Sequence, residues 1–189
     1  TEATLKRAPI IEHKIAVLAV FESVAQAVET VVAVRGSGLD PVALEFIDTH
    51  CAQMMNGSPT VHLEESPQLF MEFHATHADM LDQNIAFVQE ISEDIGCTKF
   101  YATADNKERA DLWYARHHFY EGYQRTHPDT KPYLNDVAVP ISAYPTMVNF
   151  IHDLRTTHNF PAYIIGHAGD GNVHVILPFR NDAEYKIAE

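Results

Sequence analysis

Two histidines flank a glycine-rich turn signal near the end of the chain. The segment runs His167-Ala-Gly-Asp-Gly-Asn-Val-His174, and apolar runs lie on both sides of it. Asp-Gly between two strands is the strongest short-range signal for a two-residue hairpin turn, which predicts Asp170 and Gly171 as the central turn residues. Counting outward, His167 then lies opposite His174, with Cβ atoms about 5 Å apart on one sheet face. Two imidazoles at that separation can share a metal ion, so both are predicted metal ligands.

The same pattern also has a purely structural interpretation. Two cross-strand histidines can stack or hydrogen-bond at a sheet end, and Gly-Asp-Gly-Asn is good turn chemistry anywhere. A histidine pair is also only half of a zinc-like site, which takes three or four protein ligands. A phosphate-cradling loop at residues 169–171 is disfavoured, because such a loop needs a following helix and the sequence predicts a strand there.

The elements that must position these histidines alternate between strand and helix patterns. Periods of two and of 3.6 residues predict strands over 13–21, 42–46, 69–74 and 98–102, with helices over about 23–35 and 76–95. This β-α-β-β-α-β order is the split βαβ pattern of ferredoxin-like domains. There follow a helix over 105–121, a strand over 136–140, a helix over 142–158, strands over 161–167 and 173–179, and a helix beginning at Asp182. The predicted fold class is therefore α+β, a ferredoxin-like antiparallel sheet covered by helices and extended by further strands.

Composition narrows the class of protein. The 189 residues include 13 Lys and Arg against 26 Asp and Glu, a formal net charge of −13, which argues against nucleic acid as a partner. No apolar stretch reaches the roughly 18 residues that a transmembrane segment needs. The two cysteines make no disulfide framework and favour a reducing compartment. We expect an intracellular protein, cytoplasmic or peripheral at a membrane, with a homodimer as the candidate assembly.

Three motifs in the same order resemble one family of flavoproteins. The segment from His167 to His174, the upstream segment Asp136-Val-Ala-Val-Pro140 and the helical segment Trp113-Tyr-Ala-Arg116 are similar to the C-terminal domain of FAD-linked oxidases. These are members of the vanillyl-alcohol oxidase superfamily, which includes D-lactate dehydrogenases, glycolate oxidase and D-2-hydroxyglutarate dehydrogenase. The resemblance implies that residues 1–189 are a substrate-binding cap domain, a fragment of a longer protein whose FAD-binding domain is absent here.

The resemblance also implies roles for four residues. His167 and His174 match the family's two metal-binding histidines. Asn172 matches a residue close to the substrate, and Arg116 matches the basic residue that receives the substrate carboxylate through its bidentate guanidinium. Without the family, Arg116 reads as a surface arginine on an acidic helix.

Departures from the family pattern limit what the chain is expected to do. The family's third metal ligand, a glutamate, and its catalytic base lie beyond residue 189, so no catalytic residue is expected here and the isolated chain should be inactive. Leu134 stands where the 2-hydroxyglutarate enzymes have lysine, which argues against a dicarboxylate substrate. His117 and His118 are candidates either for the substrate pocket or for solvated helix positions, and Cys51 and Cys97 are predicted to be small core residues.

The implied function is that of an FAD-dependent D-2-hydroxy-acid dehydrogenase of D-lactate, glycolate or 2-hydroxyglutarate type. Such an oxidoreductase passes a hydride from the substrate Cα to the flavin. The expected cofactors are FAD, bound outside this chain, and a divalent metal, zinc or manganese. The expected partner is a small 2-hydroxy acid, and the sequence does not identify the electron acceptor. The alternative is a non-catalytic metal- or ligand-binding module that shares the fold.

Overall fold

One seven-stranded sheet organises the molecule. The computed structural model describes residues 11–57, 62–159 and 161–188. The strands are β1 (His13–Phe21), β2 (Ala43–Ile47), β3 (Gln68–Ala75), β4 (Cys97–Thr103), β5 (Lys131–Ala138), β6 (Tyr163–Gly166) and β7 (Asn172–Phe179). Their order across the sheet is β4-β1-β3-β2-β6-β7-β5, and every neighbouring pair is antiparallel. The first four strands of that order are the predicted ferredoxin-like unit, and β6, β7 and β5 extend it, which confirms the fold class.

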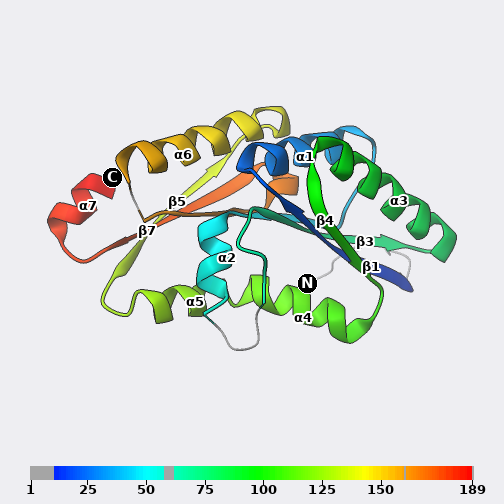
Figure 1. The fold of residues 1–189 in the computed structure, drawn as a ribbon, viewed down its shortest axis with the longest axis horizontal. Coiled ribbons are helices and arrows are strands. Elements are labelled where there is room, and N and C mark those ends of the chain that lie inside the picture. Colours follow the sequence, from blue (N-terminus) through cyan, green and yellow to red (C-terminus); the bar gives the residue numbers. More distant parts are fainter. Residues whose placement is uncertain (1–10, 58–61, 160, 189) are drawn as a thin grey trace, which may run out of the picture.

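Helices cover both faces of the sheet (Figure 1). The helices are α1 (Val24–Gly36), α2 (Thr49–Met55), α3 (Ala78–Ile95), α4 (Asn106–His117), α5 (Phe119–Thr126), α6 (Tyr144–His158) and α7 (Asp182–Ala188), with single turns η1 (Ile141–Ala143) and η2 (Ala168–Asp170). Helices α1, α3 and α6 lie on one face, and α2, α4 and α5 lie on the opposite face. We call the second of these the α4 face, because α4 supplies one of the residues of the candidate site.

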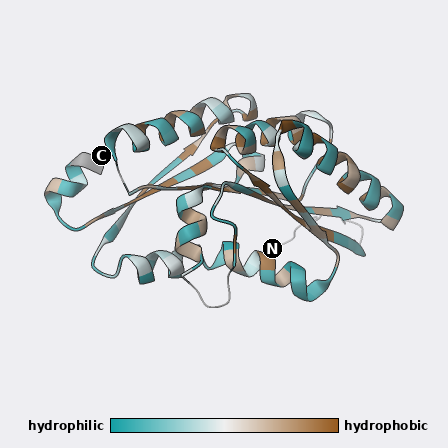
Figure 2. Ribbon diagram, viewed as in Figure 1, coloured by the Kyte–Doolittle hydropathy of each residue, from teal (hydrophilic) through white to brown (hydrophobic). Residues whose placement is uncertain are grey.

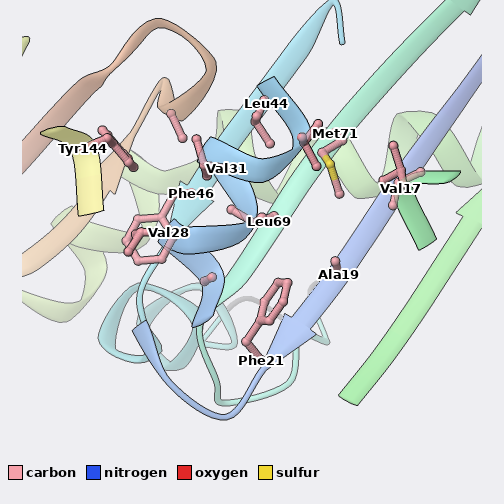
Figure 3. Close-up of a cluster of buried hydrophobic side chains, with 14 of the residues drawn as sticks. Val17, Ala19, Phe21, Val28, Val31, Leu44, Phe46, Leu69, Met71 and Tyr144 are labelled. Carbon is pink, nitrogen blue, oxygen red and sulfur yellow. The ribbon is translucent and has the colours of Figure 1, made fainter. Parts of the chain in front are cut away.

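Strand alternation gives each face its own apolar core. On β2, Leu44 and Phe46 pack in the cluster under α1, together with Val28 and Val31 (Figure 3). Ile47 belongs to a second cluster with residues of α2, α4 and α5. The strands are accordingly brown along much of their length in Figure 2, while the helices alternate between teal and brown. Since both faces are buried, a polar side chain on a central strand needs a partner within the protein.

Local signals account for several helix ends. Ser23 forms the predicted capping box, with its Oγ accepting from the Gln26 N–H at 3.3 Å and its N–H donating to Gln26 Oε1 at 3.1 Å.

The predicted helix over 105–121 is instead two helices that meet at His118. There the backbone leaves the helical region (φ −94°, ψ 19°), and the imidazole Nδ1 donates to the Tyr114 carbonyl at 2.8 Å. The His118 N–H donates to the same carbonyl at 3.1 Å, so that oxygen accepts two hydrogen bonds where the two helices meet.

Strand β5 is longer than predicted and begins before Pro132. The sequence pattern predicts a polar loop with Pro128 and Pro132, followed by a strand over 136–140. In the structure β5 is the last strand of the order and pairs only with β7. Proline is tolerated on such an edge, where no second neighbour needs its missing N–H.

Candidate functional site

The chain between β6 and β7 turns more widely than predicted. The predicted two-residue turn at Asp170 and Gly171 is wrong: residues 167–171 form a loop that contains η2. In the ladder His174 pairs with Ile165 and not with His167. The loop closes because the His167 carbonyl accepts from the N–H groups of Asp170 and Asn172, at 3.0 and 3.2 Å. Gly171 then adopts φ +73°, a left-handed conformation that favours glycine.

The two histidines nevertheless lie side by side, as predicted. Their ring centroids are 5.4 Å apart, and the ring planes are almost perpendicular, at 88°. The true register differs from the predicted one by two residues, so His174 keeps the predicted face. His167 follows β6 directly, and its ring lies on the same face beside Glu45. Two imidazoles bound to one tetrahedral ion through bonds of about 2.0–2.1 Å have ring centres roughly 5 Å apart. The observed separation is compatible with a shared ion.

A buried glutamate that the sequence analysis missed joins His167 to Arg116. Glu45 is only 9% exposed, on the α4 face of β2. Its Oε1 lies 2.8 Å from His167 Nδ1, and its Oε2 accepts from Arg116 Nη2 at 2.7 Å. In the sequence Glu45 stands out only as the one charged residue of the otherwise apolar strand Ala43–Ile47, and that pattern also fits a strand with one solvent-exposed face.

Arg116 is not the surface arginine that its helix suggests. Its side chain is only 13% exposed, and its Nε is buried without a hydrogen-bond partner. Helix α4 turns this residue toward the sheet, where the ion pair with Glu45 compensates for burying the guanidinium. Arg116, Glu45 and His167 therefore form a continuous polar network, although they come from three distant parts of the chain.

His174 lies beside a second set of polar residues, Asn172 on β7 and Asp136 on β5. Asn172 Nδ2 donates to Asp136 Oδ1 at 2.5 Å, and His174 Nδ1 lies 3.4 Å from the same oxygen. Burial lowers the pKa of His174, while the nearby Asp136 carboxylate opposes that shift. A histidine with a lowered pKa is neutral at physiological pH, the form in which imidazole binds metal. The structure thus brings together all four residues singled out from the sequence.

Comparison with known proteins settles the family. Residues 10–189 match the family model described as FAD linked oxidases, C-terminal domain. The chain belongs to this family.

Several relatives of this FAD-linked oxidase C-terminal domain are named as D-lactate dehydrogenases or glycolate oxidase subunits. The chain is 31% identical over 177 residues to a probable mitochondrial D-lactate dehydrogenase of Danio rerio, a match covering 94% of the chain and 35% of that protein. It is 27% identical to a mitochondrial D-lactate dehydrogenase (cytochrome) of Kluyveromyces lactis, over 100% of the chain and 34% of the relative. A glycolate oxidase subunit of Bacillus subtilis is 26% identical over 92% of the chain and 37% of its own length. The chain therefore spans about a third of the length of these curated relatives.

Solved structures share the fold at low sequence identity. The domain superposes on p-cresol methylhydroxylase with a TM-score of 0.67 and 13% identity, covering 95% of this chain and 42% of that one. It superposes on alkyldihydroxyacetonephosphate synthase with a TM-score of 0.64 and 14% identity, covering 96% and 38% of the two chains. These likenesses concern the fold alone.

The described residues include two candidate metal ligands, His167 and His174. Within residues 11–57, 62–159 and 161–188, no group of three or more His, Cys, Asp or Glu side chains is arranged to hold a metal ion. The predicted zinc or manganese site is therefore unsupported as a complete site of this chain. His167 and His174 fit a divalent cation as two of its ligands, because Glu45 occupies the Nδ1 of His167 and leaves the Nε2 of that ring available. Their role as ligands stays a prediction.

His117, His118 and Cys51, which the sequence also singled out, make packing contacts. His117 stacks on Trp113 with ring centroids 5.9 Å apart, and His118 stacks on Tyr114 at 3.7 Å. Cys51 is fully buried, and burial raises the pKa of its thiol well above the ordinary value. No helix in the described part of the chain has the length and apolar character to cross a bilayer.

Proposed function

We propose that this chain is the substrate-binding part of an FAD-dependent dehydrogenase of small D-2-hydroxy acids. The observation that carries the proposal is the convergence of Arg116, His167, His174 and Asn172 in one polar region of the sheet. A carboxylate-binding guanidinium beside a pair of metal-competent imidazoles suits a substrate with a hydroxyl next to a carboxylate. The names of the relatives, D-lactate dehydrogenase and glycolate oxidase, support the same substrate class.

Each of these residues has a distinct task in the proposal. Arg116 binds the substrate carboxylate; its buried and unpartnered Nε shows that Glu45 does not satisfy all its donors. Asn172, held by Asp136, lies close to the substrate. His167 and His174 hold a divalent cation whose remaining protein ligand lies outside this chain. When bound, that cation polarises the substrate hydroxyl and carboxylate oxygens as a Lewis acid.

FAD belongs to another part of the longer protein in this proposal. When bound, it accepts the hydride that leaves the substrate Cα. Residues 1–189 then form the substrate-binding cap domain, and they hold the substrate carboxylate and hydroxyl so that the Cα is correctly oriented.

Local charge favours a monocarboxylate. Among the residues that contact the two histidines or Arg116, the carboxylates of Glu45 and Asp136 accompany the guanidinium of Arg116, and the whole chain has a net charge of −13. The binding of an anionic substrate therefore depends on the added positive charge of the cation. Leu134, two residues before Asp136 on β5, is 56% exposed and offers no charge to a second carboxylate. D-Lactate and glycolate fit these features better than 2-hydroxyglutarate.

The test is turnover by the longer protein that contains this chain, purified with FAD and assayed with an artificial electron acceptor. We expect oxidation of D-lactate or glycolate, little activity with D-2-hydroxyglutarate, and loss of activity with a chelator that added Mn²⁺ or Zn²⁺ reverses. His167→Ala and His174→Ala should abolish turnover, whereas His117→Ala, which changes an exposed histidine stacked on Trp113, is the matched control. Retention of full activity by both site variants would refute the assignment. A protein that binds the acids but oxidises none would favour a non-catalytic binding module.

A further inference from the structure

Glu45 is a buried carboxylate with two partners from distant parts of the chain. The side chain is 12% exposed, and it is paired with Arg116 on α4 and with His167 after β6. A buried carboxylate is costly unless it is fully hydrogen-bonded, so its presence on a central strand calls for an explanation. The ion pair with Arg116 compensates its charge but does not account for its contact with His167.

The contact with Glu45 decides which nitrogen of His167 bears the proton. A carboxylate accepts hydrogen bonds and donates none, so the Nδ1 atom that lies 2.8 Å from Glu45 Oε1 must be the protonated one. In the neutral ring the Nε2 atom is then unprotonated and has a free lone pair. The His167 side chain is 52% exposed, so this ring is open to an incoming ligand.

His174 lacks an equivalent hydrogen bond. Its Nδ1 lies 3.4 Å from Asp136 Oδ1 and is buried without a hydrogen-bond partner, whereas Asn172 Nδ2 donates to the same Asp136 oxygen. Of these two histidines, His167 has a carboxylate at hydrogen-bond distance that defines its tautomer, and His174 does not.

The backbone of the His167 loop is held independently of Glu45. Phe46 pairs with Gly166 and Ile47 pairs with Ile165 in the β2–β6 ladder. Gly169 packs so closely on β2 that an added Cβ would lie 3.1 Å from the Cβ of Leu44. Removing the Glu45 carboxylate should therefore change the state of the imidazole and leave the loop in place.

We propose that Glu45 is a positioning residue, whose carboxylate holds His167 in the Nδ1–H tautomer and leaves Nε2 available to a divalent cation. The same carboxylate keeps Arg116 beside that ring, so one side chain orders both the cation-binding and the carboxylate-binding parts of the site. The tautomer of His167 is a property of the metal-free chain, whereas the binding of a cation at Nε2 rests on the proposed function.

The chain contains a matched control on the next strand. Glu72, on β3, is 15% exposed and is likewise paired with a histidine and an arginine, His74 at 2.6 Å and Arg109 at 3.2 Å. Its charge, burial and partners resemble those of Glu45, but it does not contact His167. If the loss of any buried carboxylate changed the state of the His167 ring, Glu72→Ala would change it as much as Glu45→Ala does.

The first measurement is the tautomer of His167, from the ring ¹⁵N chemical shifts of the metal-free chain at a pH where the ring is neutral. We expect the Nδ1–H form in the wild type and in Glu72→Ala, and a mixture of both tautomers in Glu45→Ala. Glu45→Gln should restore the Nδ1–H form, because the amide oxygen accepts the same hydrogen bond. An Nε2–H ring in the wild type would overturn the proposal without any variant, and so would an unchanged ring in Glu45→Ala.

The second measurement is a titration of the same chains with Mn²⁺ or Zn²⁺ alone, followed by broadening or shifts of the His167 and His174 ring signals. Loss of the partner that orients a ligating histidine typically weakens metal binding by roughly 10- to 100-fold. We expect a loss of that size in Glu45→Ala and none in Glu72→Ala; equal affinities in all three chains would overturn the proposed link to the cation. A wild-type chain that binds neither ion would refute the metal part of the proposed function, while the tautomer measurement would still decide the role of Glu45.

Discussion

The ion pair between Arg155 and Asp48 offers the sharpest stability test of this fold. Asp48 follows β2 directly, is fully buried, and caps α2 by accepting from the Cys51 N–H at 2.8 Å. Arg155, from α6, is 6% exposed and donates to Asp48 and, at 3.2 Å, to the Ala162 carbonyl. The pair therefore ties α6 to the junction of β2 and β6, the strands that position Glu45 and His167.

Replacing Arg155 with methionine keeps much of the side-chain volume but leaves the Asp48 carboxylate buried without its counter-ion. Removing one partner of a buried pair costs about 3–5 kcal/mol. For a domain of this size, 1 kcal/mol corresponds to about 2–4 °C, so the unfolding midpoint should fall by roughly 6–20 °C. Urea denaturation followed by far-ultraviolet circular dichroism would give the change in the free energy of unfolding.

The double variant Asp48→Asn with Arg155→Met separates charge from packing. Asparagine can still accept the Cys51 N–H as a helix cap but brings no charge into the core. The double variant should therefore be more stable than Arg155→Met alone. A loss below 1 kcal/mol in the single variant, or simple additivity in the double one, would refute the reasoning that an uncompensated charge dominates.

Three further predictions concern the site and the pH dependence. Arg116→Ala in the longer enzyme should raise the KM for the hydroxy acid by roughly 10- to 150-fold, from the loss of about 1.5–3 kcal/mol of charge-assisted binding. Gly171→Ala should destabilise the loop by at least about 1–2 kcal/mol, because its φ of +73° disfavours any Cβ and the added atom meets the neighbouring backbone. Partial burial, with Arg180 nearby, lowers the pKa of His127, which hydrogen-bonds to the Tyr163 hydroxyl. On acidification the unfolded chain takes up this proton first, so the stability that His127 provides should be lost as pH falls below about 6.5.

Each of these predictions has its own check. An unchanged KM in Arg116→Ala would remove that arginine from substrate binding, and flavin content should stay constant in either case. Gly38→Ala, at φ +86° with open space around it, is the control for the left-handed conformation without the backbone clash. For the pH dependence, the unfolding midpoint is compared between pH 7.5 and 5.5, and His127→Gln should show a smaller drop than the wild type.

Much of the fold could be predicted from local patterns. The apolar alternation of β2 and the capping box at Ser23 depend on neighbours a few residues away, so they are visible in the sequence. The break at His118 and the start of β5 before Pro132 could not be placed. The first is marked by no proline or glycine in residues 115–121, and the second depends on β5 lying at the sheet edge.

For His167 and His174, the sequence predicts one part of the geometry and the tertiary structure decides the other. The sequence by itself determined that the chain folds back between two adjacent strands, which brings His167 and His174 near one another. The face of His174 is unchanged because side-chain parity in a strand survives a shift of two residues. The sequence did not determine the loop between the two histidines, since the wider turn relies on hydrogen bonds to the His167 carbonyl.

Only the tertiary structure decided what surrounds that pair. In the sequence Glu45 is a polar position in an alternating strand and Arg116 is one of several charged positions on its helix, and both patterns are typical of solvent-exposed faces. Helix α4 covers this face of the sheet and brings the two charges to 2.7 Å of one another, across 71 residues of chain. Whether a charged side chain is buried depends on what packs over it, and no local pattern contains that information.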